Sequence, residues 1–267
     1  MARGLGIVTY GPTGIGKTHW SLYWPKPLLC INMHETGYDD LVIHPGVPEG
    51  VTGITNNEFP QLMDTLMSCL QNPTFKTIVI DSLSGFQQAF FEHLIKSDIP
   101  TTKSQSYKEA EAAFWAYYKG PRKQAPNAMP PFTSLLTALL SKGVNIVLIG
   151  HKARDTEPNE AGADYRRAVI DMDEGIRNCI LKWAPNIIYM SMQPNIVQTT
   201  KSAGYGSSAT TIEGKTDASG VKLIFTQTNP QNDAKNKLGL PYFIPIGASA
   251  EETFNKFWSL VPKAYHQ

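Results

Sequence analysis

The sequence predicts an α/β fold in which helices flank a mostly parallel central sheet, with antiparallel strands added toward the C-terminal side. Short apolar runs alternate with helical patterns along the chain, which is the order that a parallel sheet covered by helices requires. A glycine-rich turn follows the first apolar run directly, and a later run ends in an acid. The chain has 267 residues and an apolar content of 42%, so it can bury a substantial core. We therefore expect a single domain over residues 1–267.

The first predicted strand covers residues 6–10 and leads into a phosphate-binding loop. The pattern G-x-x-x-x-G-K-[ST] is matched completely by Gly11, Pro12, Thr13, Gly14, Ile15, Gly16, Lys17 and Thr18. In such a loop the glycines let backbone N–H groups turn inward around the phosphates, the lysine contacts the β and γ oxygens, and the hydroxyl coordinates Mg²⁺. The loop predicts that the chain binds a nucleoside triphosphate.

The next elements are a strand at residues 28–32, a helix at 59–70 and a buried strand at 76–81 that ends in Asp81. In enzymes with this phosphate loop, an acid at the end of an apolar strand packed beside the loop strand holds the Mg²⁺ ion. Strands also end in Asp because this residue starts turns and caps helices. The combination with the loop favours the metal role, so we expect Thr18 and Asp81 to form the metal site.

A helix is predicted at residues 84–96, and the least regular part of the sequence follows at 97–131. Aromatic residues lie next to cations there, in the run from Phe114 to Lys123. This mixture suits single-stranded nucleic acid, because bases stack on rings while cations follow the phosphates. The alternative is a helix at 107–118 that buries its aromatic face in the core or against a neighbouring subunit, and the segment alone favours this alternative.

A helix at residues 133–141 and a strand at 144–150 come next, and the strand ends at His151. A polar side chain at that strand end would face the γ-phosphate. We expect residues 152–167 to form a loop of mixed charge, which contacts nucleic acid or is solvated surface.

The C-terminal part begins with a predicted helix from Ala168 to about Trp183 and a strand at 186–192. The Gly-, Ser- and Thr-rich residues 199–220 indicate a mobile hairpin or loop, a poor candidate for chemistry. The last strand is predicted at 221–227.

Composition limits the partners and the compartment. The net charge is +1 and the charged fraction is 18%, so any contact with nucleic acid must come from a local patch. The three cysteines are far apart and lack ligand spacing, which argues for reduced thiols and against structural zinc. No signal peptide is apparent, and no stretch approaches the roughly 18 apolar residues of a membrane span. We expect a soluble, cytoplasmic protein.

Residues 234–243 have the sequence AKNKLGLPYF, which resembles the K-N-K segment of RecA recombinases. In RecA the two lysines of this segment reach across the subunit interface to the neighbour's ATP. The phosphate loop, residues 32–37, residues 79–83 and His151 occur in the order seen in RecA-like ATPases. The compact chain is most similar to the phage Sak-type single-strand annealing ATPases, and the resemblance covers most of it.

The resemblance implies a RecA-like P-loop NTPase core that hydrolyses ATP with Mg²⁺. Glu35 would polarise the attacking water and Asp81 would serve the metal. His151 stands where RecA proteins place a glutamine that senses the γ-phosphate; this is a departure, although a histidine can also donate a hydrogen bond to phosphate. Asp39 and Asp40 are alternatives to Glu35, because acids just after a strand are common as helix caps and surface residues.

Lys235 and Lys237 would act on the ATP of an adjacent subunit, as an arginine finger does in other NTPases. Hydrolysis would then require a homo-oligomer, either a ring or a filament. The implied function is ATP-dependent binding of single-stranded DNA in recombination or annealing, at the loops from Lys119 to Lys123 and from Lys152 to Arg167. The resemblance also implies a phage-encoded protein in the cytoplasm of a bacterial host, with a single-strand-binding protein as a further partner.

Two other classes of function stay open on the sequence. A P-loop kinase for small molecules has a similar length, but its lid carries several arginines, and residues 122–167 hold no R-x-x-x-R cluster. A nucleotide-dependent switch that binds protein would hydrolyse ATP slowly. Stimulation of hydrolysis by single-stranded DNA distinguishes the three classes.

Overall fold

The computed structural model describes residues 3–43, 46–97, 119–158, 162–202 and 210–266. Nine strands of this part of the chain form one sheet in the order β3-β2-β4-β5-β1-β7-β8-β9, and β6 pairs with β5. The strands are β1 (Gly6–Gly11), β2 (Leu28–Asn32), β3 (Val51–Thr55), β4 (Thr77–Asp81), β5 (Asn145–Glu157), β6 (Tyr165–Ile170), β7 (Asn186–Ser202), β8 (Thr210–Phe225) and β9 (Phe243–Pro245). The helices are α1 (Lys17–Ser21), α2 (Gly37–Ile43), α3 (Phe59–Gln71), α4 (Leu83–Lys96), α6 (Lys119–Ala128), α7 (Pro130–Ser141), α8 (Glu174–Trp183), α9 (Ala250–Leu260) and the 3-10 helix η2 (Lys263–Tyr265).

The central part of the sheet is parallel. Strands β3, β2, β4, β5, β1 and β7 pair in parallel, whereas β6, β8 and β9 are antiparallel to their partners. This arrangement confirms the predicted P-loop NTPase core with antiparallel strands toward the C-terminal side. One expectation about neighbours was wrong: β4 does not lie beside the loop strand β1, because β5 lies between them. Strand β5, which carries His151, is therefore central to the site.

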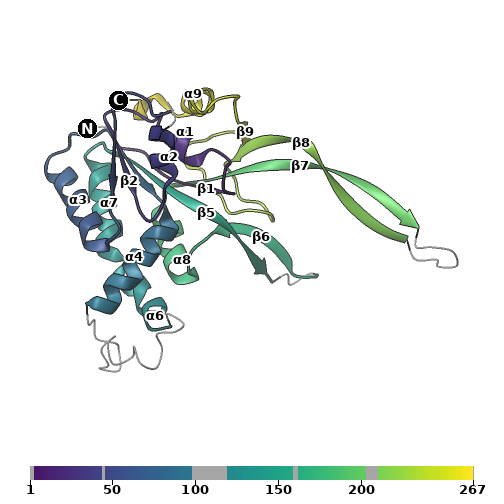
Figure 1. Ribbon diagram of the computed structural model, residues 1–267, viewed down its shortest axis with the longest axis horizontal. Coiled ribbons are helices and arrows are strands. Elements are labelled where there is room, and N and C mark those ends of the chain that lie inside the picture. The colour runs from purple at the N-terminus through teal and green to yellow at the C-terminus, as the bar shows by residue number, and fades with distance from the viewer. Residues whose placement is uncertain (1–2, 44–45, 98–118, 159–161, 203–209, 267) are drawn as a thin grey trace.

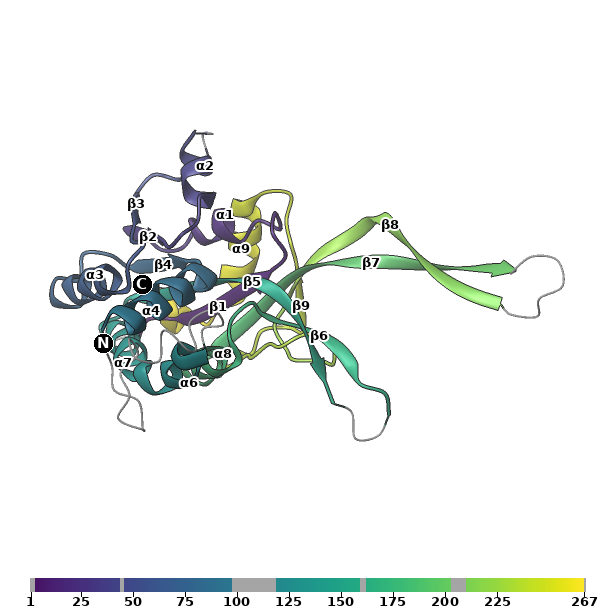
Figure 2. The same ribbon diagram turned by 60° about the horizontal axis from the view of Figure 1, so that its bottom comes forward.

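Two apolar layers cover the sheet, and their members alternate along each strand as the strand pleat requires. Val8 and Tyr10 of β1 belong to the layer under α3, α4, α6, α7 and α8, whereas Ile7 belongs to the layer under α1 and α9. Figures 1 and 2 show these two groups of helices on opposite faces of the sheet. In the second layer the rings of Trp24 and Phe257 lie 6.1 Å apart, which fixes α9 over the start of the chain.

The region after His151 differs from the prediction, because it is a hairpin and not a loop. Strand β5 continues to Glu157 and pairs antiparallel with β6, so that Lys152 lies opposite Ile170. The predicted helix from Ala168 was also wrong at its start: Ala168 is a buried part of β6, and α8 begins only after Asp173. The Asp173 carboxylate accepts a hydrogen bond from the N–H of Gly175 at 3.2 Å and caps α8.

Residues 119–128 were expected to be irregular and form helix α6 instead. Pro121 lies in its first turn, where a missing N–H costs nothing, and Pro126 lies near its end. The helix packs against α8, since a Cβ added at Gly175 would come within 2.7 Å of Pro126. The alternative helix at residues 107–118 lies outside the described residues.

The remaining differences concern edges and extensions of the fold. Helix α2 and strand β3 were missed: α2 has no buried residue and β3 is a half-exposed edge strand. Strands β7 and β8 form a long hairpin that leaves the body of the protein (Figure 1), so the hairpin interpretation of residues 199–220 is confirmed.

All three cysteines are free. Among the described helices, none combines the length and the hydropathy that crossing a bilayer requires.

Candidate active site

The phosphate-binding loop connects the buried strand β1 to helix α1, and two of its glycines have positive φ. Gly14 has a φ of 76° and Gly16 a φ of 101°, values that residues with a side chain rarely adopt. Lys17 begins α1 and is only 5% exposed. Its Nζ donates hydrogen bonds to the carbonyl oxygens of Gly11 at 3.0 Å and Pro12 at 2.9 Å. The amine therefore lies against the loop that is expected to hold the phosphates.

The electrostatics of Lys17 fit an anionic ligand. Burial lowers the pKa of its amine, because the charged form loses hydration, and the carboxylates of Asp81 and Glu35 act in the opposite direction. The two carbonyl oxygens that accept its hydrogen bonds carry only partial charges. A triphosphate would add full negative charges beside this amine and favour its charged form. The loop is thus suited to bind a triphosphate through Lys17.

Thr18 and Asp81 come together as a pair of oxygen ligands. The Thr18 hydroxyl donates a hydrogen bond to Asp81 Oδ2 at 2.6 Å, although the two residues lie on different elements. Asp81 is buried, and burial raises the pKa of its carboxyl; the charge of Glu35 adds to this rise, while the Thr18 hydrogen bond opposes it. A hydroxyl and a carboxylate at this separation suit Mg²⁺, which prefers oxygen ligands and completes its shell with water and phosphate. The residues present therefore fit the metal.

Glu35 and His151 form the second half of the site. His151 Nε2 lies 2.8 Å from Glu35 Oε1, and the Ser82 hydroxyl donates to the same Oε1 at 2.8 Å. Because a carboxylate only accepts hydrogen bonds, Nε2 carries the proton in this contact. Among the described residues no hydrogen bond reaches Glu35 Oε2, and the Glu35 side chain is 29% exposed. This second oxygen can therefore bind a water molecule at the edge of the site.

The two alternatives to Glu35 lie elsewhere. Asp39 and Asp40 are exposed residues in the first turn of α2. Asp40 Oδ2 accepts a weak hydrogen bond from the Thr36 hydroxyl at 3.4 Å, a local contact within that turn. Neither carboxylate contacts His151 or Ser82 in the described structure. Of these three acids, Glu35 is the one that contacts His151 and Ser82 in the described structure.

Lys235 and Lys237 do not contact the phosphate loop of their own chain. Lys235 Nζ donates to the carbonyl oxygen of Leu181 at 3.1 Å, while Lys237 is exposed. Burial, together with the charge of Lys237, lowers the pKa of Lys235. Asn236 lies between the two lysines and fixes the turn that follows, since its Oδ1 accepts from the N–H groups of Leu238 and Leu240 at 3.1 Å each.

The two segments expected to contact DNA lie on different elements. In α6, Arg122 Nε lies 3.3 Å from Asp173 Oδ2, and the Arg122 side chain is 56% exposed. The hairpin β5–β6 instead continues directly from His151. Its basic residues line an open cavity that includes no described residue of α6. Neither segment is the loop that we expected, because one is a helix and the other a strand pair.

Sequence reasoning missed three residues around Thr18 and Asp81, the pair that fits Mg²⁺. Ser82 follows Asp81 directly, caps α4 and also donates to Glu35. A Cβ at Gly37 would lie 3.3 Å from Thr18 Oγ1. Asn32 pairs in register with Asp81, is 1% exposed, and its Nδ2 has no hydrogen-bond partner among the described residues. Asn32 and Ser82 stand at the ends of apolar strands, which the sequence shows, but the contacts of all three residues depend on the strand order.

We expect the substitution Asp81→Asn to separate stability from activity. The pKa of Asp81 is higher in the folded protein than in the unfolded chain, so the folded protein binds this proton more readily. The free energy of unfolding therefore falls as the pH rises from the unfolded pKa through the folded pKa, where Asp81 becomes ionised. The amide keeps the size and an acceptor for Thr18 but removes the buried charge. The variant should melt at a higher temperature at pH 7 and lose this pH dependence, while Mg²⁺-dependent hydrolysis falls about 10²-fold or more.

Thermal melting between pH 4 and 8, together with hydrolysis titrated with Mg²⁺, tests both effects. Ser84→Ala is a suitable control, because among the described residues the one hydrogen bond of its hydroxyl goes to the carbonyl oxygen of Asp171. Lower stability of Asp81→Asn at neutral pH would contradict the expected cost of the buried charge.

Comparisons with known proteins show the family of the chain. A family model described as an AAA domain matches residues 3–238. No match was found among curated proteins. The family match includes the phosphate loop, Glu35, Asp81, His151 and the K-N-K segment, and it extends over most of the chain. The chain therefore belongs to the AAA domain family and is a P-loop ATPase.

Proposed function

We propose that this ATPase binds single-stranded DNA in an ATP-dependent manner, as a recombination or annealing protein of the RecA-like type, and hydrolyses ATP at the interfaces of a homo-oligomer. Strand β5 is the observation that carries the proposal. It holds His151 against Glu35 and continues, with the next residues, into the hairpin β5–β6, which carries the exposed Arg154 and Arg166. A single strand thus connects the nucleotide site to a surface that suits a polyanion.

The charges of this hairpin support the proposal. Arg154 and Arg166 are exposed, and neither makes an ion pair with any described residue. Arg167 is different, because it is bound by Glu157 at 3.0 Å and by Asp233. Asp155 is neutralised by Arg177 at 2.7 Å. Within the described part of the chain, Arg154 and Arg166 are therefore exposed cations without an ion-pair partner, and such cations attract phosphate groups.

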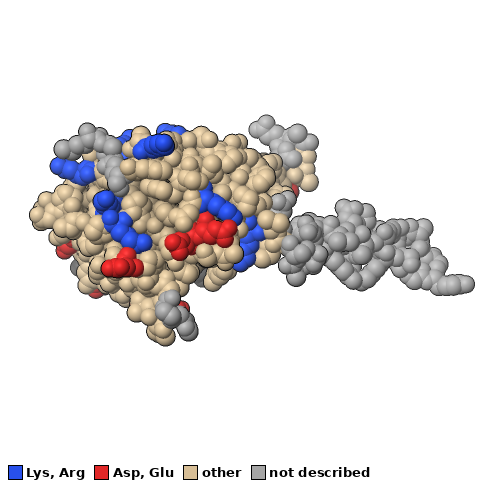
Figure 3. Space-filling model, turned by 90° about the horizontal axis from the view of Figure 1, so that it is seen from above, with Lys and Arg blue, Asp and Glu red and all other residues tan. Residues whose placement is uncertain are grey.

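The face that carries α1, α2 and α9 is less suited to a polyanion. On this face, Lys and Arg lie in small groups beside Asp and Glu on a largely uncharged surface (Figure 3). The net charge of the chain is only +1. Binding of DNA must then come from a local patch, and the hairpin β5–β6 provides one.

In this proposal each site residue has a separate task. Lys17 binds the β and γ oxygens, Thr18 and Asp81 hold Mg²⁺, and Glu35 orients the attacking water through Oε2. Mg²⁺, when bound, neutralises charge that develops on the phosphate oxygens. A γ-phosphate beside His151 competes with Glu35 for the Nε2 proton, and movement of His151 shifts Lys152 because the two are adjacent in β5. Nucleotide state and DNA binding are coupled in this way.

The test is steady-state ATP hydrolysis with and without a poly-dT oligonucleotide, with Lys17→Ala as the blank. We expect single-stranded DNA to stimulate hydrolysis, and ATP to strengthen DNA binding. Arg154→Ala/Arg166→Ala should weaken the binding and reduce its dependence on salt, because two phosphate contacts are lost. Lys142→Ala is the matched control, since this exposed lysine follows α7 at the opposite end of β5.

Two results would contradict the proposal. Equal DNA affinity with and without ATP would remove the coupling. Tight ATP binding without stimulation by DNA would favour the small-molecule kinase or the protein-binding switch, and a screen of phosphoryl acceptors would then separate these two.

A further inference from the structure

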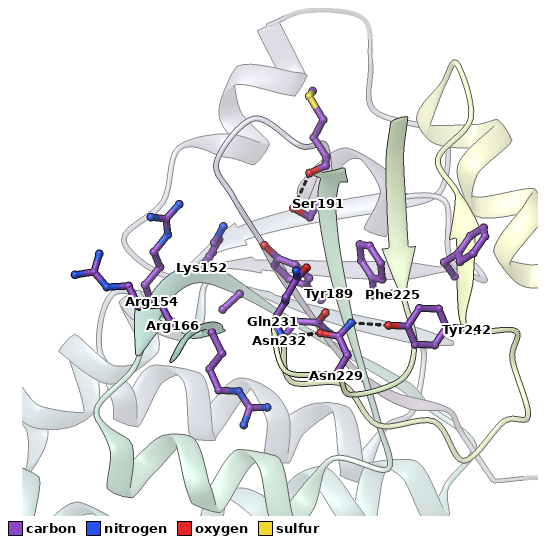
Figure 4. Close-up of a pocket in the computed structure, with 14 residues that line it drawn as sticks. Lys152, Arg154, Arg166, Tyr189, Ser191, Phe225, Asn229, Gln231, Asn232 and Tyr242 are labelled. Carbon is purple, nitrogen blue, oxygen red and sulfur yellow. Dashed lines mark hydrogen bonds between the residues drawn. The ribbon is translucent and has the colours of Figure 1, made fainter. Parts of the chain in front are cut away.

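An open cavity of about 640 Å³ lies where the hairpins β5–β6 and β7–β8 leave the sheet. Its volume is in the range of small-ligand sites, roughly 300–1,000 Å³. Figure 4 shows basic side chains from β5 and β6 on one side, aromatic rings on the opposite side, and the side-chain amides of Asn229, Gln231 and Asn232 between them. This order of groups matches the parts of one nucleotide, which has an anionic phosphate, a flat base and a polar base edge.

The aromatic side of the cavity is partly exposed and is supported from behind. Tyr242 is 42% exposed, and its ring meets that of Phe225 edge-on at 6.2 Å. Phe225 stacks on Tyr189 at 6.1 Å, and Tyr189 packs against Tyr10 of β1 at 4.9 Å. Tyr242 therefore offers a ring to a ligand, while the rings behind it are fixed by the core. A ring held in this way suits stacking on a base.

A short turn between the two sides supplies hydrogen-bonding groups. Asn229 Nδ2 donates to Tyr242 Oη at 2.7 Å, and Asn229 Oδ1 accepts from the N–H groups of Gln231 and Asn232 at 2.7 and 3.0 Å. These bonds fix both the turn and the tyrosine. The carboxamide of Gln231 is exposed and has no partner among the described residues. It can both donate to and accept from a base edge.

The third group of side chains in the cavity is cationic and comes from β5 and β6. Lys152 Nζ lies 5.8 Å from the centre of the Tyr189 ring, so this charge is held at the floor of the cavity. Arg154 and Arg166 extend at its rim without ion pairs among the described residues. A phosphate on either side of a bound base would meet these cations.

We propose that this cavity receives one unstacked nucleotide of a single strand, with its base on Tyr242, its edge at Gln231 and its phosphates at Arg154 and Arg166. The inference rests on the proposed function and adds the place where the strand is held. An acidic peptide would use the cations but would leave the rings and the amide without a role. A duplex keeps its bases stacked, out of reach of Tyr242.

The experiment uses a dT oligonucleotide that carries 2-aminopurine, whose fluorescence is quenched when it stacks on a ring. The full-length protein should quench it. Tyr242→Ala should abolish this quenching and weaken DNA binding about 10- to 100-fold. Tyr242→Phe is the matched control, because it keeps the ring and loses only the hydroxyl bonded to Asn229; quenching should persist. Melting temperatures of both variants establish that they are folded.

The possible failures are distinguishable. If Tyr242→Ala binds and quenches like the unmodified protein while DNA still stimulates hydrolysis, the cavity is not the nucleotide site, and the proposed function stands. If poly-glutamate displaces the oligonucleotide equally well from the unmodified protein and from Tyr242→Ala, the cavity binds acidic chains through its cations alone. If the unmodified protein binds no single-stranded DNA, the proposed function itself is wrong.

Discussion

Glu35→Gln is expected to lower the kcat of ATP hydrolysis by about 10²- to 10⁴-fold, the range that a catalytic base contributes. The amide keeps the length of the side chain, and its Oε1 can still accept from Ser82 and His151, which lie 2.8 Å away. What is lost is the negative charge that polarises the attacking water. Binding of ATP should change little, because Lys17 and Thr18 are intact. Single-turnover hydrolysis and equilibrium binding of ATP measure the two effects separately.

Asp39→Asn and Asp40→Asn are the matched controls for this prediction. Each removes one carboxylate from the exposed first turn of α2, close in sequence to Glu35. Because neither contacts His151 or Ser82 in the described structure, hydrolysis should stay close to that of the unmodified protein. Loss of activity in Asp40→Asn, with Glu35→Gln active, would move the catalytic role to α2.

The nucleotide half of the site could be predicted from the sequence because its residues are local. The phosphate loop is one continuous motif, and Asp81 ends a strongly apolar strand, so both were recognised without tertiary information. The contact between His151 and Glu35 could not be derived in this way. It exists because β5 lies between β1 and β4, and a strand order is a property of the whole sheet.

The errors after Gly150 have a common physical cause. The apolar pattern of β5 ends where the strand leaves the core, yet the backbone continues to pair with β6 through polar residues such as Arg154. Periodicity follows burial, so a hairpin that extends beyond the core loses its signal. The cavity at its base joins residues from five separate stretches of the chain, between positions 152 and 243. Sequence spacing alone does not bring Lys152 and Tyr242 together.

The largest expected effect concerns the lysines of the K-N-K segment. Lys235→Ala/Lys237→Ala should lower hydrolysis about 10³- to 10⁵-fold if these residues act as an arginine finger does in other NTPases. Lys235 also donates a hydrogen bond to the Leu181 carbonyl, so its replacement removes a contact of the fold as well as a charge. Lys237→Ala is therefore tested as well, because the Lys237 side chain is exposed. Melting temperature and ATP binding of each variant separate a local role from misfolding.

A mixing experiment then decides whether the lysines act across an interface. Lys17→Ala has a defective nucleotide site but keeps Lys235 and Lys237. The Lys235→Ala/Lys237→Ala variant keeps its nucleotide site but lacks these two lysines. Each alone should be nearly inactive. In a one-to-one mixture of head-to-tail subunits, about a quarter of the interfaces combine an intact site with an intact neighbour, and hydrolysis should recover accordingly. If the two variants form mixed oligomers without recovery, Lys235 and Lys237 do not complete a neighbour's site. Recovery would mean that the oligomer, and not the single chain, is the unit that hydrolyses ATP.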